Sequence, residues 1–276
     1  MISICVKSLN KKYLNTIEQH LDNLEFENIL YSQKKFKHFY NIIIHYTGTK
    51  IKKFYTLLNN IIAEAIIENF EKILITKQFE YDFFYFSQKE RKQIMLFLEN
   101  SLNIPTNFNT KKDLLISALQ NYFESNNICN IDGFINFRIA DYKHYINLIL
   151  EKEINNYVLN KEYCEYVDLL KNYIATQNTQ TDLVHLIYSD TTKMLLDNSK
   201  EIITNDENLK YISDITFSSN DFILNSLLSY LPEKIIIHLN TEEDNFIRFL
   251  KLIFTDKIIF CTNCEICNSQ YVHIKK

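Results

Sequence analysis

The spacing of apolar side chains divides the chain into segments with a period of two and segments with a period near four. Residues 2–6 form a short β-branched run, and residues 11–24 then carry apolar side chains at helical spacing. Residues 29–46 have the pattern of two strands, the second of which stops at the turn signal of residues 47–49. The opening of the chain therefore predicts a βαββ unit.

The middle of the chain has the pattern of amphipathic helices. Apolar residues recur every three or four positions over residues 51–73. A second helix is predicted over residues 87–102, opened by the capping-box sequence SQKE and ended by Pro105, and a third over residues 110–123. These segments predict a helical layer after the βαββ unit.

The second half begins with a long helical pattern over residues 132–177. After it, strand and helix patterns alternate at short intervals, which favours a small α/β layer. We expect strands at residues 183–188, 194–196, 234–239 and 257–261, and helices at residues 221–231 and 241–254.

Together these elements predict a helix-rich α+β fold with an N-terminal βαββ unit, a helical middle and a C-terminal small α/β layer. The polar stretch 124–130 predicts the boundary between an N-terminal α+β lobe, residues 1–126, and a helical segment plus α/β lobe, residues 127–276. The first part carries 16 basic and 13 acidic residues and the second carries 14 and 21, a change of sign that supports two lobes. One continuous domain is the alternative.

Composition narrows the function classes. The 276 residues are 46% hydrophobic, which supplies ample material for a core, but they include two glycines. Phosphate-binding loops, dinucleotide fingerprints and serine hydrolase elbows need several glycines close together, so these enzyme classes are excluded and a non-enzymatic role is favoured. The N-terminus does not resemble a signal peptide and no window is apolar enough to span a membrane, so we expect a cytoplasmic protein with reduced cysteines.

The one motif with clear chemical content lies near the C-terminus. Cys261, Cys264 and Cys267 are spaced so that three thiolates can surround a soft metal from one loop, and His273 is the nearest candidate for a fourth ligand. If this loop binds a metal, zinc or an iron–sulfur cluster is the candidate cofactor, although a ferredoxin-type run would have cysteine at Tyr271. Ordinary packed or exposed thiols are the simpler explanation, and thiol redox chemistry is a further one.

Three stretches of the chain resemble the YtxC family of endospore-forming Firmicutes. They are residues 65–71 with 83–86, the segment Asp132–Tyr142 with its continuation to residue 177, and residues 246–248 leading into the cysteines. The resemblance covers most of the chain from about residue 60. It implies a role in sporulation, and it carries over no catalytic residue and no mechanism. We therefore expect a cytoplasmic interaction module with a protein partner.

The segment most similar to the family contains a pair of opposite charges. Arg138 and Asp141 are three residues apart in a predicted helix, a spacing that favours a local ion pair. Phe134, Phe137 and Tyr142 are then expected in the core. This structural role is favoured over a functional one.

A run without acidic residues lies between Glu27 and Glu64. If the predicted hairpin and the following helix start bring its lysines together, they form a basic face with aromatic rings, as single-strand nucleic-acid binders use. Solvated lysines on strand exteriors are the commoner explanation, so nucleic acid is a less favoured partner than protein. The run contains Lys34, Lys35, Lys37, Lys50, Lys52 and Lys53 with His38, His45 and four tyrosines.

Overall fold

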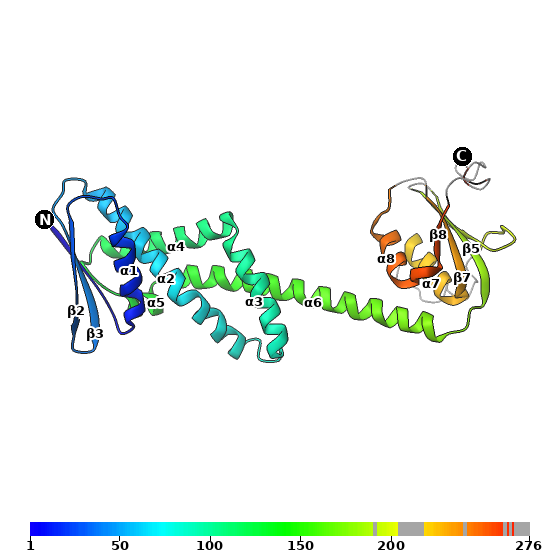
Figure 1. The fold of residues 1–276 in the computed structure, drawn as a ribbon, viewed down its shortest axis with the longest axis horizontal. Coiled ribbons are helices and arrows are strands. Elements are labelled where there is room, and N and C mark those ends of the chain that lie inside the picture. Colours follow the sequence, from blue (N-terminus) through cyan, green and yellow to red (C-terminus); the bar gives the residue numbers. More distant parts are fainter. Residues whose placement is uncertain (190–191, 204–217, 240–241, 262–263, 265–266, 268–276) are drawn as a thin grey trace. The chain divides into compact units, whose positions relative to one another are not determined.

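The computed structural model describes residues 1–276 except 190–191, 204–217, 240–241, 262–263, 265–266 and 268–276 (Figure 1). The chain forms two compact units, Met1–Val158 and Leu159–Lys276. The boundary falls within a long helix, not in the polar stretch 124–130 where the sequence placed it. The fold is a helix-rich α+β fold with two small mixed sheets, as predicted.

The first unit contains a four-stranded sheet in the order β2-β3-β1-β4. Strands β1 (Ile2–Ser8), β2 (Ile29–Phe36) and β3 (Phe39–Tyr46) form its antiparallel part, which confirms the βαββ opening. Strand β4 (Ile128–Asn130) pairs parallel with β1. This return of the chain to the first sheet is why the polar stretch 124–130 lies inside a unit instead of separating two.

Helices cover one face of this sheet, because β1 and β3 alternate between buried side chains and half-exposed ones. The capping box at Ser87 opens α3 as predicted. Helix α4 begins at Pro105, five residues earlier than predicted, because proline is favoured in the first turn of a helix as well as after the end of one. The helices are α1 (Lys11–Asp22), α2 (Ile51–Tyr81), α3 (Gln88–Asn103), α4 (Pro105–Phe123), α5 (Ile131–Phe137) and α6 (Ala140–Thr176).

A buried polar network joins three of these helices. The side chain of Lys111 on α4 is 1% exposed. Its Nζ donates hydrogen bonds to both carboxylate oxygens of Glu71 on α2, each at 2.9 Å. The hydroxyl of Tyr142 on α6 donates to the same carboxylate at 2.9 Å. Burial, and then the charge of Glu71, raise the pKa of Tyr142, so this phenol stays protonated as a donor. The network fixes α2, α4 and the start of α6 in one register.

The second unit is built on a sheet in the order β6-β5-β7-β8. Strands β5 (Thr181–Tyr188), β7 (Pro232–Leu239) and β8 (Ile258–Phe260) are parallel, and β6 (Lys193–Leu196) is antiparallel to β5. Helices α7 (Ser219–Tyr230) and α8 (Asn245–Phe254) pack on one face of the sheet (Figure 1). The short 3-10 helix η2 (Thr255–Lys257) leads into β8.

Two helices of this unit end in left-handed backbone without glycine. Leu231 follows α7 with φ 41°, and Thr255 follows α8 with φ 38°. Leu231 stands directly before β7, and Thr255 begins the turn that leads to β8. A branched side chain at positive φ is strained. Leu231 is buried, so the packing around it offsets the strain there, whereas Thr255 is exposed.

No helix among the described residues is both long and apolar enough to cross a membrane.

Replacing Lys111 by Met should lower the free energy of unfolding by about 3–5 kcal/mol, because Glu71 then keeps a buried charge without its cation. The double variant Lys111→Met with Glu71→Gln should lose less, because no buried charge is left unpaired. Lys112→Met is the matched control: Lys112 binds the more exposed Glu64, so its loss should cost about 1 kcal/mol or less. Urea unfolding followed by circular dichroism measures all three, and equal losses for Lys111→Met and Lys112→Met would contradict this account.

Tyr142→Phe should destabilise the protein by about 1–3 kcal/mol at pH 8, because the hydroxyl donates to a charged carboxylate. The pKa of Tyr142 is higher in the folded state than the ordinary value of 10.0. Its contribution is therefore complete below pH 10 and is lost as the pH rises, since the unfolded chain releases this proton first. The stability difference between wild type and Tyr142→Phe should shrink between pH 10 and 11. A difference that grows over this range would show that the sign is wrong.

Candidate metal centre

Strand β7 supplies the histidine of a metal-ligand cluster. Along β7, Ile235 and Ile237 point to the side of α7 and α8, so His238 points to the opposite face of the sheet. His238 is 3% exposed. A polar ring at this depth needs partners, and the cysteine loop provides them.

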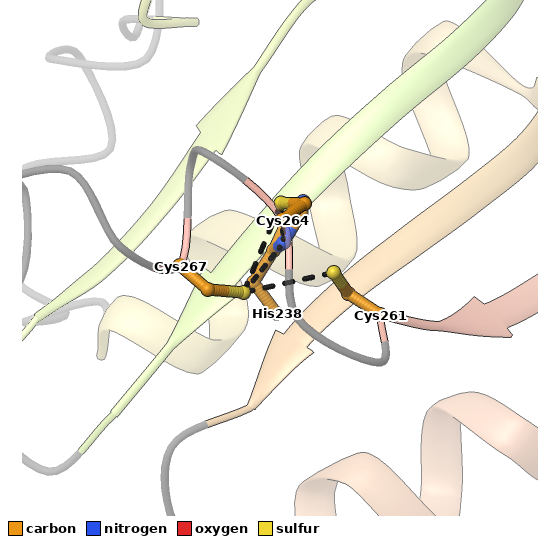
Figure 2. Close-up of side chains that lie close together, drawn as sticks. All are labelled: His238, Cys261, Cys264 and Cys267. Carbon is orange, nitrogen blue, oxygen red and sulfur yellow. Dashed lines mark hydrogen bonds between the residues drawn. The ribbon is translucent and has the colours of Figure 1, made fainter.

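Strand β8 delivers the first cysteine to the same place. β8 runs parallel to β7, and the backbone N–H of Cys261 continues the ladder by donating to the carbonyl of Ile237 at 2.9 Å. Cys261 therefore lies beside Ile237, the neighbour of His238 in the sequence. Cys264 and Cys267 follow on the loop and turn back toward the histidine, as Figure 2 shows.

The ligand atoms of His238, Cys261, Cys264 and Cys267 all lie within 4.8 Å of one another. The Sγ atom of Cys267 lies 3.6 Å from that of Cys261 and 3.9 Å from that of Cys264. Nδ1 of His238 lies 3.3 Å from Sγ of Cys267 and 3.5 Å from Sγ of Cys264 (Figure 2). A tetrahedral zinc ion with ordinary bond lengths has edges of about 3.8 Å between sulfurs and about 3.5 Å between nitrogen and sulfur. The four observed distances, 3.3, 3.5, 3.6 and 3.9 Å, agree with those edges.

The chemical types of the four ligands also favour a single zinc ion. Three thiolates and one imidazole are a common zinc combination, and soft sulfur ligands select zinc over magnesium or calcium. Burial, with a smaller effect from His185, lowers the pKa of His238, so its imidazole is neutral at pH 7 and can offer a lone pair. An iron–sulfur cluster places several atoms between its ligands and needs sulfurs that are further apart than these.

A second histidine stands behind the first. His185 of β5 is 8% exposed, and its Nδ1 lies 3.0 Å from Nε2 of His238. The ring centroids are 5.2 Å apart and the ring planes differ by 29°, which is compatible with a contact between the ring edges. Burial, and then the charge of Lys200, lower the pKa of His185. Next to these rings, Cys264 packs against the apolar side chains of Ile187 and Leu196.

The comparison with known families concerns most of the chain. The family model of the YtxC-like family matches residues 56–259. The chain belongs to the YtxC-like family. The match includes His185 and His238 and ends two residues before Cys261, so the cysteines lie beyond the matched part.

One curated relative extends this family result. The YtxC-like chain is 20% identical over 154 residues to the uncharacterized protein YtxC of Bacillus subtilis (strain 168), an alignment that covers 54% of each chain. The chain thus spans about half the length of the curated relative it matches. No solved structure matches it.

The fourth ligand that the sequence suggested, His273, lies outside the described residues. His238 was missed, although a signal for it exists. It ends the apolar run Ile235-Ile236-Ile237, and the next strand along the chain ends directly before Cys261. Two consecutive strands joined by a helix pair in parallel, so their carboxyl ends meet at one edge of the sheet.

The charged pair of the family-like segment does not form. Helix α5 ends at Phe137 and α6 starts at Ala140, so Arg138 and Asp141 are not on one helix. Among the described residues no ion pair joins them, and both line a cavity of about 480 Å³ between α4 and the start of α6. The same break turns Phe137 outward, where it is 83% exposed and not in the core as predicted, whereas Phe134 and Tyr142 are buried.

The lysines of the run between Glu27 and Glu64 do not form one face. Lys34 and Lys35 lie near the β2–β3 turn, opposite Asn41 and Tyr40. Lys50 and the start of α2 come after Tyr46, at the other end of β3. Five or six residues along β3, roughly 17–20 Å, lie between the two groups. The condition on which the nucleic-acid hypothesis depended is therefore not met.

Proposed function

We propose that this chain is a zinc-binding protein in which Cys261, Cys264, Cys267 and His238 hold one Zn²⁺. The observation that carries the proposal is the agreement between the four sulfur and nitrogen separations and the edges of a zinc tetrahedron. Four protein ligands leave no position for water or substrate. The site is therefore structural and not catalytic.

The structural task of the zinc follows from where the loop lies. The helices α7 and α8 cover one face of the second sheet, and the opposite face presents His185 and Ile187 of β5 and His238 of β7. Cys264 packs on this face, against Ile187 and Leu196. A short loop buries too little apolar area to hold itself there, so metal–ligand bonds would supply the missing free energy.

The role that we propose for the folded protein is an interaction module in sporulation, located in the cytoplasm. The sporulation part rests on the family resemblance. The interaction part is supported by large aromatic side chains that are exposed on the first unit, because aromatic residues are enriched in protein interfaces. They are Tyr81, Phe84, Tyr85 and Phe137, between 64% and 83% exposed.

Anaerobically purified protein should contain about one zinc per chain by elemental analysis, and replacing Cys261, Cys264 and Cys267 by Ser should remove it. Cobalt substitution should give the visible absorption of a tetrahedral thiolate site. Adding a chelator should lower the thermal midpoint of the wild type but not of the triple variant, because zinc binds only the folded site. Cys164→Ser, on the exposed surface of α6, is the matched control and should keep the metal.

Two histidine variants identify the fourth ligand. His238→Ala should reduce the zinc content or weaken zinc binding at least 100-fold, whereas His273→Ala should leave both unchanged. The opposite result would return the fourth ligand to His273. An iron chromophore, or a metal-free protein that a chelator does not affect, would overturn the zinc proposal.

Deleting the gene should reduce the yield of heat-resistant spores, which plating after heat treatment measures. A copy with the triple Cys→Ser change should restore sporulation less well than the wild-type copy or the Cys164→Ser copy. Normal spore yield in the deletion strain would contradict the sporulation role, and it would leave the zinc site to be judged by the metal analysis alone.

A further inference from the structure

The second imidazole nitrogen of His238 determines how the first can act. Nδ1 faces the sulfur atoms of Cys264 and Cys267. An imidazole that binds a metal through Nδ1 carries its proton on Nε2. Because His238 is 3% exposed, this N–H is cut off from bulk water and needs an acceptor inside the protein.

The acceptor is on the neighbouring strand. Nδ1 of His185 lies 3.0 Å from Nε2 of His238, and it is the hydrogen-bond partner that the described residues offer to this nitrogen. β5 and β7 pair in parallel with Ile187 opposite His238, so His185 and His238 are diagonal neighbours on one face of the sheet. The backbone ladder therefore sets the distance between the two rings.

We infer that His185 is a positioning residue for the metal: its Nδ1 accepts the Nε2 proton of His238, fixes the tautomer that exposes the Nδ1 lone pair, and holds the ring toward the three sulfurs. The inference rests on the proposed zinc site. Partners of this kind orient ligating histidines in many metal sites and raise their basicity. His185 itself is not one of the four ligands, because its Nδ1 faces His238 and not the cysteines.

The charge of the site explains why a histidine suits this position. Three thiolates and one Zn²⁺ leave a net charge of −1 in a half-buried loop. A carboxylate, the other common partner of a ligating histidine, would add a second negative charge beside the first and lose its hydration. A neutral imidazole accepts the same hydrogen bond without that cost.

The test uses two substitutions of nearly equal shape. His185→Asn keeps an acceptor oxygen where Nδ1 stood, and His185→Leu has the same size without an acceptor. Zinc affinity of the full chain is measured by competition with a coloured chelator. We expect His185→Leu to bind zinc 10–100-fold more weakly than the wild type, and His185→Asn to stay within about threefold. The cobalt spectrum should change in the Leu variant and stay close to wild type in the Asn variant.

Each outcome has a defined meaning. Both variants remove the same ring, so equal weakening of both would show that packing is responsible and would overturn the positioning role. Unchanged affinity in His185→Leu, with loss of zinc in His238→Ala, would overturn it too and leave the zinc site intact. A wild type that binds no zinc would instead overturn the proposed function. Circular dichroism of the chelator-treated variants checks folding, and His185→Ala replaces the Leu variant, with the same expectation, if that one does not fold.

Discussion

The parallel pairing of β7 with β8 is the constraint on which the candidate metal centre depends. It brings Cys261, which directly follows β8, beside Ile237 through a backbone hydrogen bond, and thus within reach of His238. Cys261 and His238 are 23 positions apart in the sequence, and this pairing brings them into one group of ligands. Side-chain chemistry at the cysteines decides what is bound there. The backbone ladder decides that the ligands meet at all.

The two units use different polar contacts to fix the positions of their helices and strands. In each, a small mixed sheet has helices on one face and must fix the elements that the apolar core alone leaves free to slide. The first unit uses the buried carboxylate of Glu71, which joins three helices through Lys111 and Tyr142. The second has its polar cluster on the face away from the helices, where His185 contacts His238 and His238 faces Cys264 and Cys267. Directional contacts thus supply specificity that packing does not.

The sequence predicted the features that depend on neighbouring residues. The capping box at Ser87 and the βαββ opening follow from local patterns, and both are present. Pro105 was ambiguous, because the same ring ends one helix and begins the next. Phe137 was misplaced because apolar spacing continues through Arg138, where the backbone leaves the helix. His238 was missed because its relation to Cys261 exists only through strand pairing, and the unit boundary was misplaced because β4 returns to a strand more than a hundred residues earlier.

The scarcity of glycine has its own consequence for the second unit. Leu231 and Thr255 take left-handed backbone at the two helix ends that precede β7 and β8, where most proteins place glycine. Each such residue stores about 1–3 kcal/mol that the surrounding structure must offset. The two strands that position the candidate ligands are thus each preceded by a strained residue. Releasing the metal ligands would remove contacts that help to offset this strain, so we expect β7, β8 and the helices before them to open as one cooperative unit.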